Sequence, residues 1–299
     1  MKYVLLLVFF WSCNGINKEH GPAAFQSNKS YLSDSEKQII IDLPYNISPG
    51  QKLDVYFPKN HNENTRTIFY IHGGGWFAGD KSEAFYWAEY FQELGYVVVS
   101  INYRLADRNK NNVYPSQIAD IDSAINFILK RSEDWKISKT NNIIMGASAG
   151  AQLALQYAYN FNESKKIKAA ISFCGALDLT DSIFINADVG PGMNMNKTNF
   201  STLLTWYLGD TITNKPNIWK DASPVNHITS SSVPSFFLHG KSDEKIPYQQ
   251  SLKAFNILKS LGVHCQLELL ENVNHDLLSL DLNDQLKKVD KFINANVPN

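Results

Sequence analysis

The sequence Gly146-Ala147-Ser148-Ala149-Gly150 joins two segments of different character. The apolar residues 142–145 before it have the composition of a buried strand, and residues 151–158 after it are rich in helix formers. A strand that turns sharply into a helix brings the flanking backbone segments close together, which favours glycine at both ends. The motif therefore predicts a serine hydroxyl at the apex of a strand–turn–helix corner. A plain glycine-rich turn with a surface serine is the alternative that the rest of the chain must exclude.

Apolar strand-like segments alternate with amphipathic helical segments along most of the chain. Residues 117–129, for example, place Ile118, Ile121 and Ile125 on one helical face. The strand-like segments are 51–57, 67–71, 96–101, 142–145, 168–173, 234–238 and 266–270, and the helical segments are 81–94, 117–129, 151–158, 252–258 and 286–295. This alternation predicts an α/β fold with a mostly parallel central sheet flanked by helices.

A long irregular region, about residues 176–225, interrupts this alternation. It contains Gly190-Pro191-Gly192 and the aromatic residues Trp206, Tyr207 and Trp219. Irregular inserts of this length are more often functional than structural, so we predict a cap over Ser148, with plain surface decoration as the alternative. No linker divides the rest, which predicts one domain over residues 46–299, preceded by a polar arm over residues 13–45.

The first residues predict export from the cell. A lysine at position 2 is followed by nine apolar residues, 3–11, which suits the apolar part of a secretory signal. Ser12 and Cys13 follow where cleavage is expected, as in a bacterial lipoprotein signal, so we predict a signal peptide over residues 1–12 and a lipid on Cys13. The protein would then lie in the bacterial cell envelope and contact the membrane only through this anchor. Ordinary secretion and a buried N-terminal element are the alternatives.

The composition excludes several classes of protein. The 299 residues are 44% hydrophobic and 19% charged, with a formal net charge of −1, and no basic run suggests a nucleic-acid surface. The three cysteines, Cys13, Cys174 and Cys265, form neither a disulfide framework nor a metal motif, although a Cys174–Cys265 bridge is possible. We expect no metal, nucleotide or other cofactor.

A second glycine-rich motif, His72-Gly73-Gly74-Gly75-Trp76, directly follows the strand-like residues 67–71. Consecutive glycines let backbone N–H groups approach a ligand closely. In acyl transfer such groups can hold the oxyanion that develops on the attacked carbonyl. A phosphate-binding loop is disfavoured, because no Lys and Ser/Thr follow at the required spacing.

A serine nucleophile needs a base, and seven histidines are available. His275 lies in a polar loop after the last strand-like segment, at the sheet edge where catalytic loops gather in α/β folds. His227, near the end of the insert, is an outside candidate. His239 closes the strand-like residues 234–238, where a structural role is expected.

Three segments together resemble one known family: Tyr70-Ile71-His72-Gly73-Gly74-Gly75-Trp76, Ser100-Ile101-Asn102-Tyr103-Arg104-Leu105 and the Ser148 motif. They are similar to α/β-hydrolases of the hormone-sensitive-lipase-like carboxylesterase group, in particular the bacterial acetylxylan and feruloyl esterase (BD-FAE-like) type. Residues 114–120, 222–225 and 239–247 also fit this type, and the resemblance covers roughly residues 50–295.

The resemblance implies a triad of Ser148, Asp243 and His275, and an oxyanion hole made by the backbone N–H groups of Gly74, Gly75 and Ala149. We expect Asp243 to orient the histidine rather than its neighbour Glu244, because adjacent side chains in an irregular loop usually diverge. The chain departs from the family at Lys241, where Asp is usual, and at residues 272–274, where Gly commonly precedes the histidine.

The expected function is hydrolysis of short-chain or aromatic carboxylic esters. An export signal and an aromatic insert favour acetyl or feruloyl groups on plant polysaccharide, so the partner is a small-molecule or carbohydrate-linked ester. An arylformamidase or a peptidase would use the same residues, and a binding module that has lost catalysis is an alternative of another class.

Overall fold

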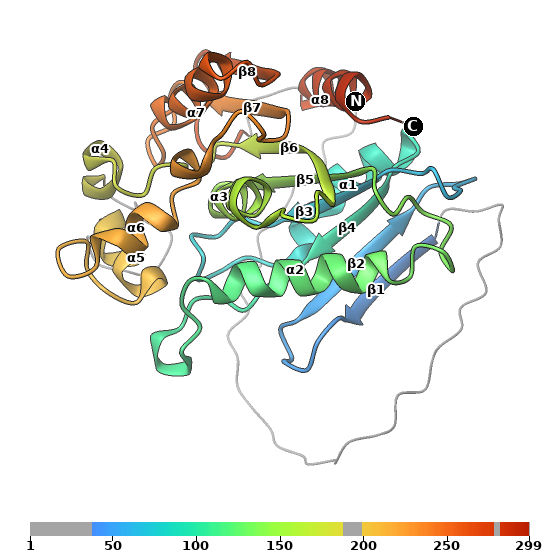
Figure 1. The fold of residues 1–299 in the computed structure, drawn as a ribbon, viewed down its shortest axis with the longest axis horizontal. Coiled ribbons are helices and arrows are strands. Elements are labelled where there is room, and N and C mark those ends of the chain that lie inside the picture. The colour runs from blue at the N-terminus through green and yellow to red at the C-terminus, as the bar shows by residue number, and fades with distance from the viewer. Residues whose placement is uncertain (1–37, 188–198, 278–281, 299) are drawn as a thin grey trace, which may run out of the picture. The chain divides into compact units, whose positions relative to one another are not determined.

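The structure, a computed structural model, describes residues 38–187, 199–277 and 282–298 (Figure 1). Eight strands form one sheet in the order β1-β2-β4-β3-β5-β6-β7-β8. Their bounds are β1 Gln38–Pro44, β2 Lys52–Phe57, β3 Thr67–Ile71, β4 Val97–Ile101, β5 Asn142–Ala147, β6 Ile167–Phe173, β7 Ser235–Gly240 and β8 Cys265–Leu270. The pairs β1–β2 and β2–β4 are antiparallel, and all the others are parallel. The predicted α/β fold with a mostly parallel sheet is confirmed.

Helices cover both faces of the sheet. Helices α2 (Ser116–Leu129), α3 (Ala149–Gln156) and α7 (Gln249–Ser260) pack on one face, and α2 and α3 lie in front of the sheet in Figure 1. Helices α1 (Phe85–Glu93) and α8 (Leu282–Asn296) pack on the other face. Burial on both faces explains why the strands of the parallel part are continuously apolar.

The side chains of β3 pack alternately against the two helix layers. Phe69 and Ile71 belong to the hydrophobic cluster under α2 and α3, whereas Ile68 and Tyr70 belong to the cluster under α1 and α8. Successive side chains of a strand point to opposite faces, so the alternation follows from strand geometry. All five residues of β3 are buried, which fixes the strand that leads into His72-Gly73-Gly74-Gly75, here called the HGGG loop.

Part of the predicted arm is a strand, which corrects the boundary of the domain. Residues 38–44, placed in the polar arm over residues 13–45, form β1 and pair with β2, with a bulge between Ile40 and Leu43. The amide of Asp42 donates to Asp54 Oδ1 at 2.8 Å across this pair. The prediction was wrong here because an edge strand leaves half of its apolar side chains exposed: 46% of Ile39 and 57% of Ile41 are accessible.

The insert contains three short helices, α4 (Ser182–Asn186), α5 (Phe200–Leu208) and α6 (Pro216–Asp221), which lie together at the left of Figure 1. Local signals set their ends: the Asn199 side chain accepts from the amide of Thr202, and Gly209 ends α5 with a φ of +83°. Residues 188–198, with Gly190-Pro191-Gly192, lie outside the described residues. The remaining short helical turns are η1 Lys81–Ala84, η2 Arg108–Lys110, η3 Tyr157–Phe161 and η4 Pro224–His227.

The signal segment 1–12, Cys13 and the arm up to residue 37 also lie outside the described residues, so export and lipidation stay predictions. Within the described residues, no helix is long and apolar enough to cross a membrane. Cys174 and Cys265 are free thiols, so the disulfide that the sequence left open does not form.

Candidate active site

Ser148 lies at the apex of a tight turn between β5 and α3. Its φ is +55° and its ψ is −122°, and its amide donates to the carbonyl of Phe173 at 2.8 Å. A Cβ on Gly146 would lie 2.3 Å from the Gly150 carbonyl oxygen, and a Cβ on Gly150 would lie 2.2 Å from the Ile71 carbonyl oxygen. Both neighbours are backbone atoms that cannot move aside, so the turn requires glycine on both sides of the serine.

The structure brings Ser148, His275 and Asp243 together, although they come from three separate loops. Ser148 Oγ lies 3.0 Å from His275 Nε2, and His275 Nδ1 lies 2.7 Å from Asp243 Oδ2. A carboxylate only accepts hydrogen bonds, so the hydrogen of the neutral imidazole lies on Nδ1. The lone pair of Nε2 is then free to accept the hydroxyl hydrogen of Ser148. This is the arrangement in which an imidazole acts as a base toward a serine.

Asp243 is held in its ionised form by its surroundings. Its Oδ1 accepts from the amides of Lys245 at 2.9 Å and Ile246 at 2.8 Å, and its Oδ2 accepts from His275 and, at 3.1 Å, from His239. Burial alone would raise the pKa of this carboxyl, but the hydrogen bonds from the two histidines and the amide outweigh it. The pKa of Asp243 therefore lies well below its usual range.

His239 supports Asp243, a role that the sequence did not reveal. Its Nε2 lies near two acceptors, Asp243 Oδ2 and the Ile246 carbonyl at 2.9 Å, so this nitrogen must carry a hydrogen. Its Nδ1 lies 2.8 Å from Ser251 Oγ on α7, which fixes the ring. The sequence predicted a structural role for His239 but not its partner; the spacing of four residues to Asp243 was the available signal.

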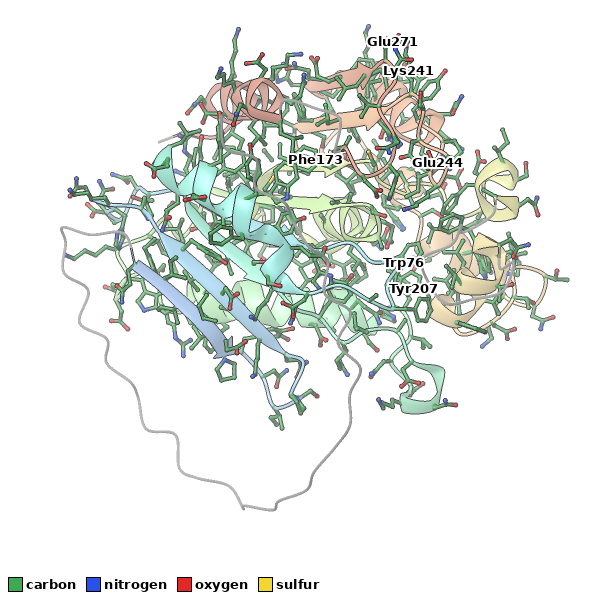
Figure 2. The ribbon with its side chains drawn as sticks, turned by 180° about the vertical axis from the view of Figure 1, so that it is seen from behind. Trp76, Phe173, Tyr207, Lys241, Glu244 and Glu271 are labelled. Carbon is green, nitrogen blue, oxygen red and sulfur yellow. The ribbon has the colours of Figure 1, made fainter. Side chains whose placement is uncertain are left out.

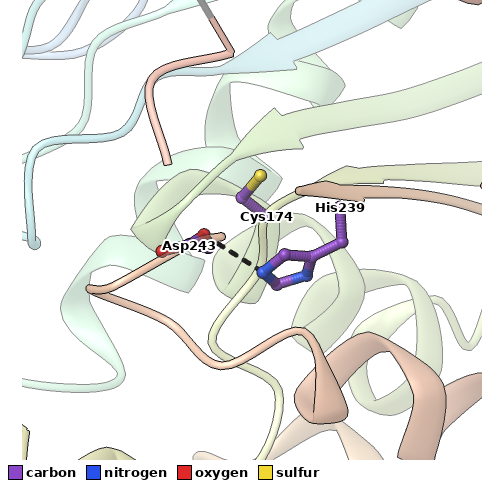
Figure 3. A group of neighbouring side chains, drawn as sticks. All are labelled: Cys174, His239 and Asp243. Carbon is purple, nitrogen blue, oxygen red and sulfur yellow. Dashed lines mark hydrogen bonds and ion pairs between the residues drawn. The ribbon is translucent and has the colours of Figure 1, made fainter. Parts of the chain in front are cut away.

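Figure 3 shows the buried group of Cys174, His239 and Asp243, whose potential metal-ligating atoms all lie within 4.8 Å of one another. The Nε2 atom of His239 already carries a hydrogen that it donates to Asp243 and to a carbonyl. Burial, with the nearby charge of Asp243, raises the pKa of the Cys174 thiol, which disfavours the thiolate that a metal requires. In this arrangement the group acts as a hydrogen-bonding support for the carboxylate.

The other residues that the sequence offered as acid or base are not part of this hydrogen-bonded chain. Glu244 is exposed, and in Figure 2 it lies at the surface. His227 donates from Nε2 to the Asp221 carbonyl at 2.6 Å instead of contacting Ser148. His72 is buried and stacks on Tyr103, with 4.4 Å between ring centroids, so it serves the glycine loop.

The HGGG loop follows β3 and turns beside the serine. Gly74 and Gly75 have φ values of +96° and +60°, which favour glycine, and a Cβ on Gly73 would lie 3.4 Å from Ser148 Cβ. Within the described residues, the amides of Gly74, Gly75 and Ala149 donate no hydrogen bond to the protein. Donors of this kind beside a serine hydroxyl suit a developing oxyanion.

The insert holds this loop in place. Tyr207 of α5 stacks on Trp76, with 4.6 Å between ring centroids and 11° between planes (Figure 2). Trp76 Nε1 donates to Gln152 Oε1 at 2.8 Å, and Gln152 Nε2 donates to the Ala222 carbonyl at 2.8 Å. Gln152 was also missed from the sequence, although a polar residue in an apolar helix is a signal. The described part of the insert thus supports the glycine loop, and a cap over Ser148 stays a prediction.

The two departures from the family pattern leave the triad geometry intact. Lys241 forms an ion pair with Glu271 at the surface, where Figure 2 shows the two side chains side by side. The amide of Ser242 donates to the Val273 carbonyl at 3.0 Å, so the loop of Asp243 and the loop of His275 are joined directly. Asn272 adopts a φ of +56°, a conformation that asparagine tolerates better than most residues.

Comparison with known proteins places this geometry in context. The chain is 29% identical to Esterase LipQ of Mycobacterium tuberculosis over 237 residues, which are 74% of this chain and 53% of LipQ. It is 31% identical to Kynurenine formamidase of Danio rerio over 153 residues, 48% of each chain. The chain thus spans about half the length of these curated relatives.

In structure, the chain is similar to a bifunctional GH43-CE protein of Bacteroides eggerthii. The TM-score is 0.72 at 22% identity, over 88% of this chain and 38% of that one, which shows a shared fold. The sequence profile of the BD-FAE family matches residues 53–258, which include the HGGG loop, the Ser148 turn and Asp243. Since this match covers more than half of the chain, the protein belongs to the BD-FAE family.

Proposed function

We propose that the protein is a serine hydrolase of carboxylic esters, and that it removes short-chain or aromatic acyl groups, acetyl or feruloyl, from plant polysaccharide. The observation that carries the proposal is the continuous chain of hydrogen bonds from Asp243 through His275 to Ser148. Beside it lie the amides of Gly74 and Gly75, which donate to no acceptor in the part of the chain that the structure describes. The relative LipQ bears the name of an esterase, which agrees with this chemistry.

In the proposed reaction, His275 Nε2 takes the proton as Ser148 Oγ attacks the ester carbonyl. The carbonyl oxygen becomes an oxyanion that the amides of Gly74, Gly75 and Ala149 bind; in other enzymes the loss of one such donor costs about 3–4 kcal/mol of transition-state stabilisation. His275 then protonates the leaving alcohol, and an acyl-serine remains. A water molecule then attacks the acyl-serine while His275 takes its proton. His275 returns this proton to Ser148 Oγ as the carboxylic acid leaves. Asp243 stabilises the imidazolium and maintains the Nδ1–H tautomer throughout.

The substrate class is tested together with the reaction. The aromatic residues of the insert suit sugars or phenolic rings, and the GH43-CE protein shares the fold. The test measures turnover of p-nitrophenyl acetate and butyrate, acetylated xylan and methyl ferulate by the wild type and by Ser148→Ala. We expect turnover of at least one polysaccharide-type ester, and a loss of at least about 10⁴-fold in the variant. No turnover of any ester, or full activity of Ser148→Ala, would overturn the proposal.

A second candidate is an arylformamidase, which would cleave an N-formyl aromatic amine with the same residues. The similarity to Kynurenine formamidase favours it. Adding formanilide to the same panel separates the two: a kcat/KM for formanilide above that for every ester would replace the esterase proposal with this one.

A further inference from the structure

A surface cavity of about 920 Å³ opens next to the HGGG loop. Its walls are residues 48–50 of the β1–β2 turn, residues 104–107 and part of 109–112 after β4, and the two aromatic side chains Phe77 and Trp206. We name it the Phe77–Trp206 cavity. Pockets that bind drug-sized ligands measure about 300–1,000 Å³, so this volume exceeds what a short acyl group requires.

Both aromatic walls are attached to the loop that carries the proposed oxyanion donors. Phe77 lies two residues after Gly75, and its amide donates to the Gly74 carbonyl at 3.2 Å. Trp206 precedes Tyr207, the residue that stacks on Trp76 (Figure 2). A third wall is tied to the same loop, because the amide of Ala106 donates to the Trp76 carbonyl at 2.8 Å. A ligand in the cavity therefore lies beside the HGGG loop.

The aromatic pair offers an open apolar surface. Phe77 and Trp206 meet edge to face, with 6.1 Å between ring centroids and 80° between planes, and 36% of Trp206 is exposed. The lining also includes polar side chains, among them Ser48, Asn109 and Asn112. A pyranose ring has C–H groups on its faces and hydroxyl groups around its rim, so it matches a wall that combines aromatic rings with hydrogen-bonding groups.

The charged residues in the described lining of the cavity, Arg104, Asp107 and Lys110, have partners within the protein. Arg104 donates hydrogen bonds from Nε and Nη2 to the buried carboxylate of Asp120, and Nη2 lies 2.7 Å from Oδ1. Lys110 lies 3.2 Å from Asp107 Oδ2. The Lys110 pair is exposed and weak, but a phosphate or carboxylate ligand would have to displace the buried Asp120 carboxylate from Arg104, which favours a neutral ligand.

We infer that the Phe77–Trp206 cavity is the site that binds the neutral sugar chain to which the ester is attached. This inference rests on the proposed function for its catalytic part, whereas sugar binding by itself does not require turnover. A sugar ring stacked on Trp206 would lie beside the HGGG loop, and small esters without a sugar would not make this contact.

The first arm of the test is kinetic. Trp206→Ala should lower kcat/KM for acetylated xylo-oligosaccharides by about tenfold or more, mainly through KM, and change that for p-nitrophenyl acetate less than about twofold. The matched control is Phe161→Ala, since Phe161 is also exposed, at 37%, and lies outside the cavity lining. An equal loss on both substrates would show that Trp206 acts only by supporting the HGGG loop, and would overturn the inference.

The second arm measures binding alone, in Ser148→Ala, by calorimetry. The probes are unsubstituted xylohexaose, mannohexaose and cellohexaose, with oligogalacturonide as the acidic contrast. We expect at least one neutral chain to bind, to bind more weakly by tenfold or more when Trp206→Ala is added, and to bind better than the acidic chain. The inference would be overturned if none of the neutral chains binds, or if Trp206→Ala leaves their binding unchanged. Binding without ester turnover in the wild type would overturn the proposed function and leave the cavity assignment standing.

Discussion

At the scale of single residues, the carboxylate that orients His275 gives the sharpest test of the proposed mechanism. Asp243→Asn should lower kcat by up to about 10⁴-fold on p-nitrophenyl acetate, because an amide in this place favours the wrong imidazole tautomer. Glu244→Gln is the matched control, and its exposed side chain should make the change less than about twofold. If the two variants rank in the opposite order, Glu244 orients the histidine and the proposed triad is wrong.

The sequence predicted the members of the triad, but it did not predict the contacts that hold Asp243 and His275 in place. The Ser148 motif is local, and the position of His275 follows from the sheet edge at which loops gather. Three of the four hydrogen bonds to Asp243 are local, from His239, Lys245 and Ile246, and the fourth comes from His275 in a distant loop. The close approach of the two loops appears in the backbone, since a Cβ on Gly240 would lie 2.2 Å from the Val273 carbonyl oxygen. No periodic pattern in the sequence records this approach of the two loops. The spacing of four residues between His239 and Asp243 was visible in the sequence, but it did not reveal which way the two side chains turn.

At the scale of elements, the turn between β5 and α3 depends on close contact with the end of β3. Gly150→Ala should lower the free energy of unfolding by about 2–4 kcal/mol, because the new Cβ would lie 2.2 Å and 2.3 Å from the carbonyl oxygens of Ile71 and His72. Gly50→Ala, with no atom within 4 Å of the added Cβ, should change it by less than about 0.5 kcal/mol. Urea unfolding of both variants measures the difference, and equal values would refute the steric argument.

The strands that are covered on both faces of the sheet could be predicted from the sequence, whereas the edge strand β1 and the short helices of the insert could not. The parallel strands are continuously apolar because helices cover both faces, and a reader of the sequence can recognise such runs. The edge strand β1 has no fully buried residue, and its sequence lacks the polar–apolar alternation that marks a half-exposed strand. Helices α4 to α6 are five to nine residues long and depend on caps and on packing against the sheet domain, which leaves little periodicity to detect.

At the scale of the whole molecule, the low pKa of Asp243 links stability to pH. The ordinary pKa of an aspartate is about 3.9, and the folded-state pKa lies below it. The unfolded chain therefore binds a proton first as the pH falls, so the stabilisation is present above about pH 4 and is lost progressively below it. The free energy of unfolding of the wild type should fall more steeply between pH 5 and pH 3 than that of Asp243→Asn. Parallel curves in urea titrations at each pH would contradict this.

Cellular location is a second property of the whole molecule, and it stays a prediction from residues 1–13. A lipid on Cys13 would hold the protein on a membrane, whereas residues 38–187, 199–277 and 282–298 contain no spanning helix. Cys13→Ser should therefore move the protein from the membrane fraction to the soluble fraction of its host. A wild type that is already soluble, with a mature chain that starts at another residue, would exclude the lipid anchor.

The backbone conformation of Ser148 sets the thermal stability of the protein against its catalytic activity. A φ of +55° with a ψ of −122° is rarely adopted by residues other than glycine and costs about 1–3 kcal/mol. Ser148→Gly should relieve this strain and melt at a higher temperature than Ser148→Ala, with a gain of about 1 kcal/mol after the greater chain entropy of glycine is counted. Equal melting temperatures would show that the turn is unstrained. If the gain is found, laboratory evolution for heat resistance alone would favour inactive enzyme, so every round of selection must also include a screen for catalysis.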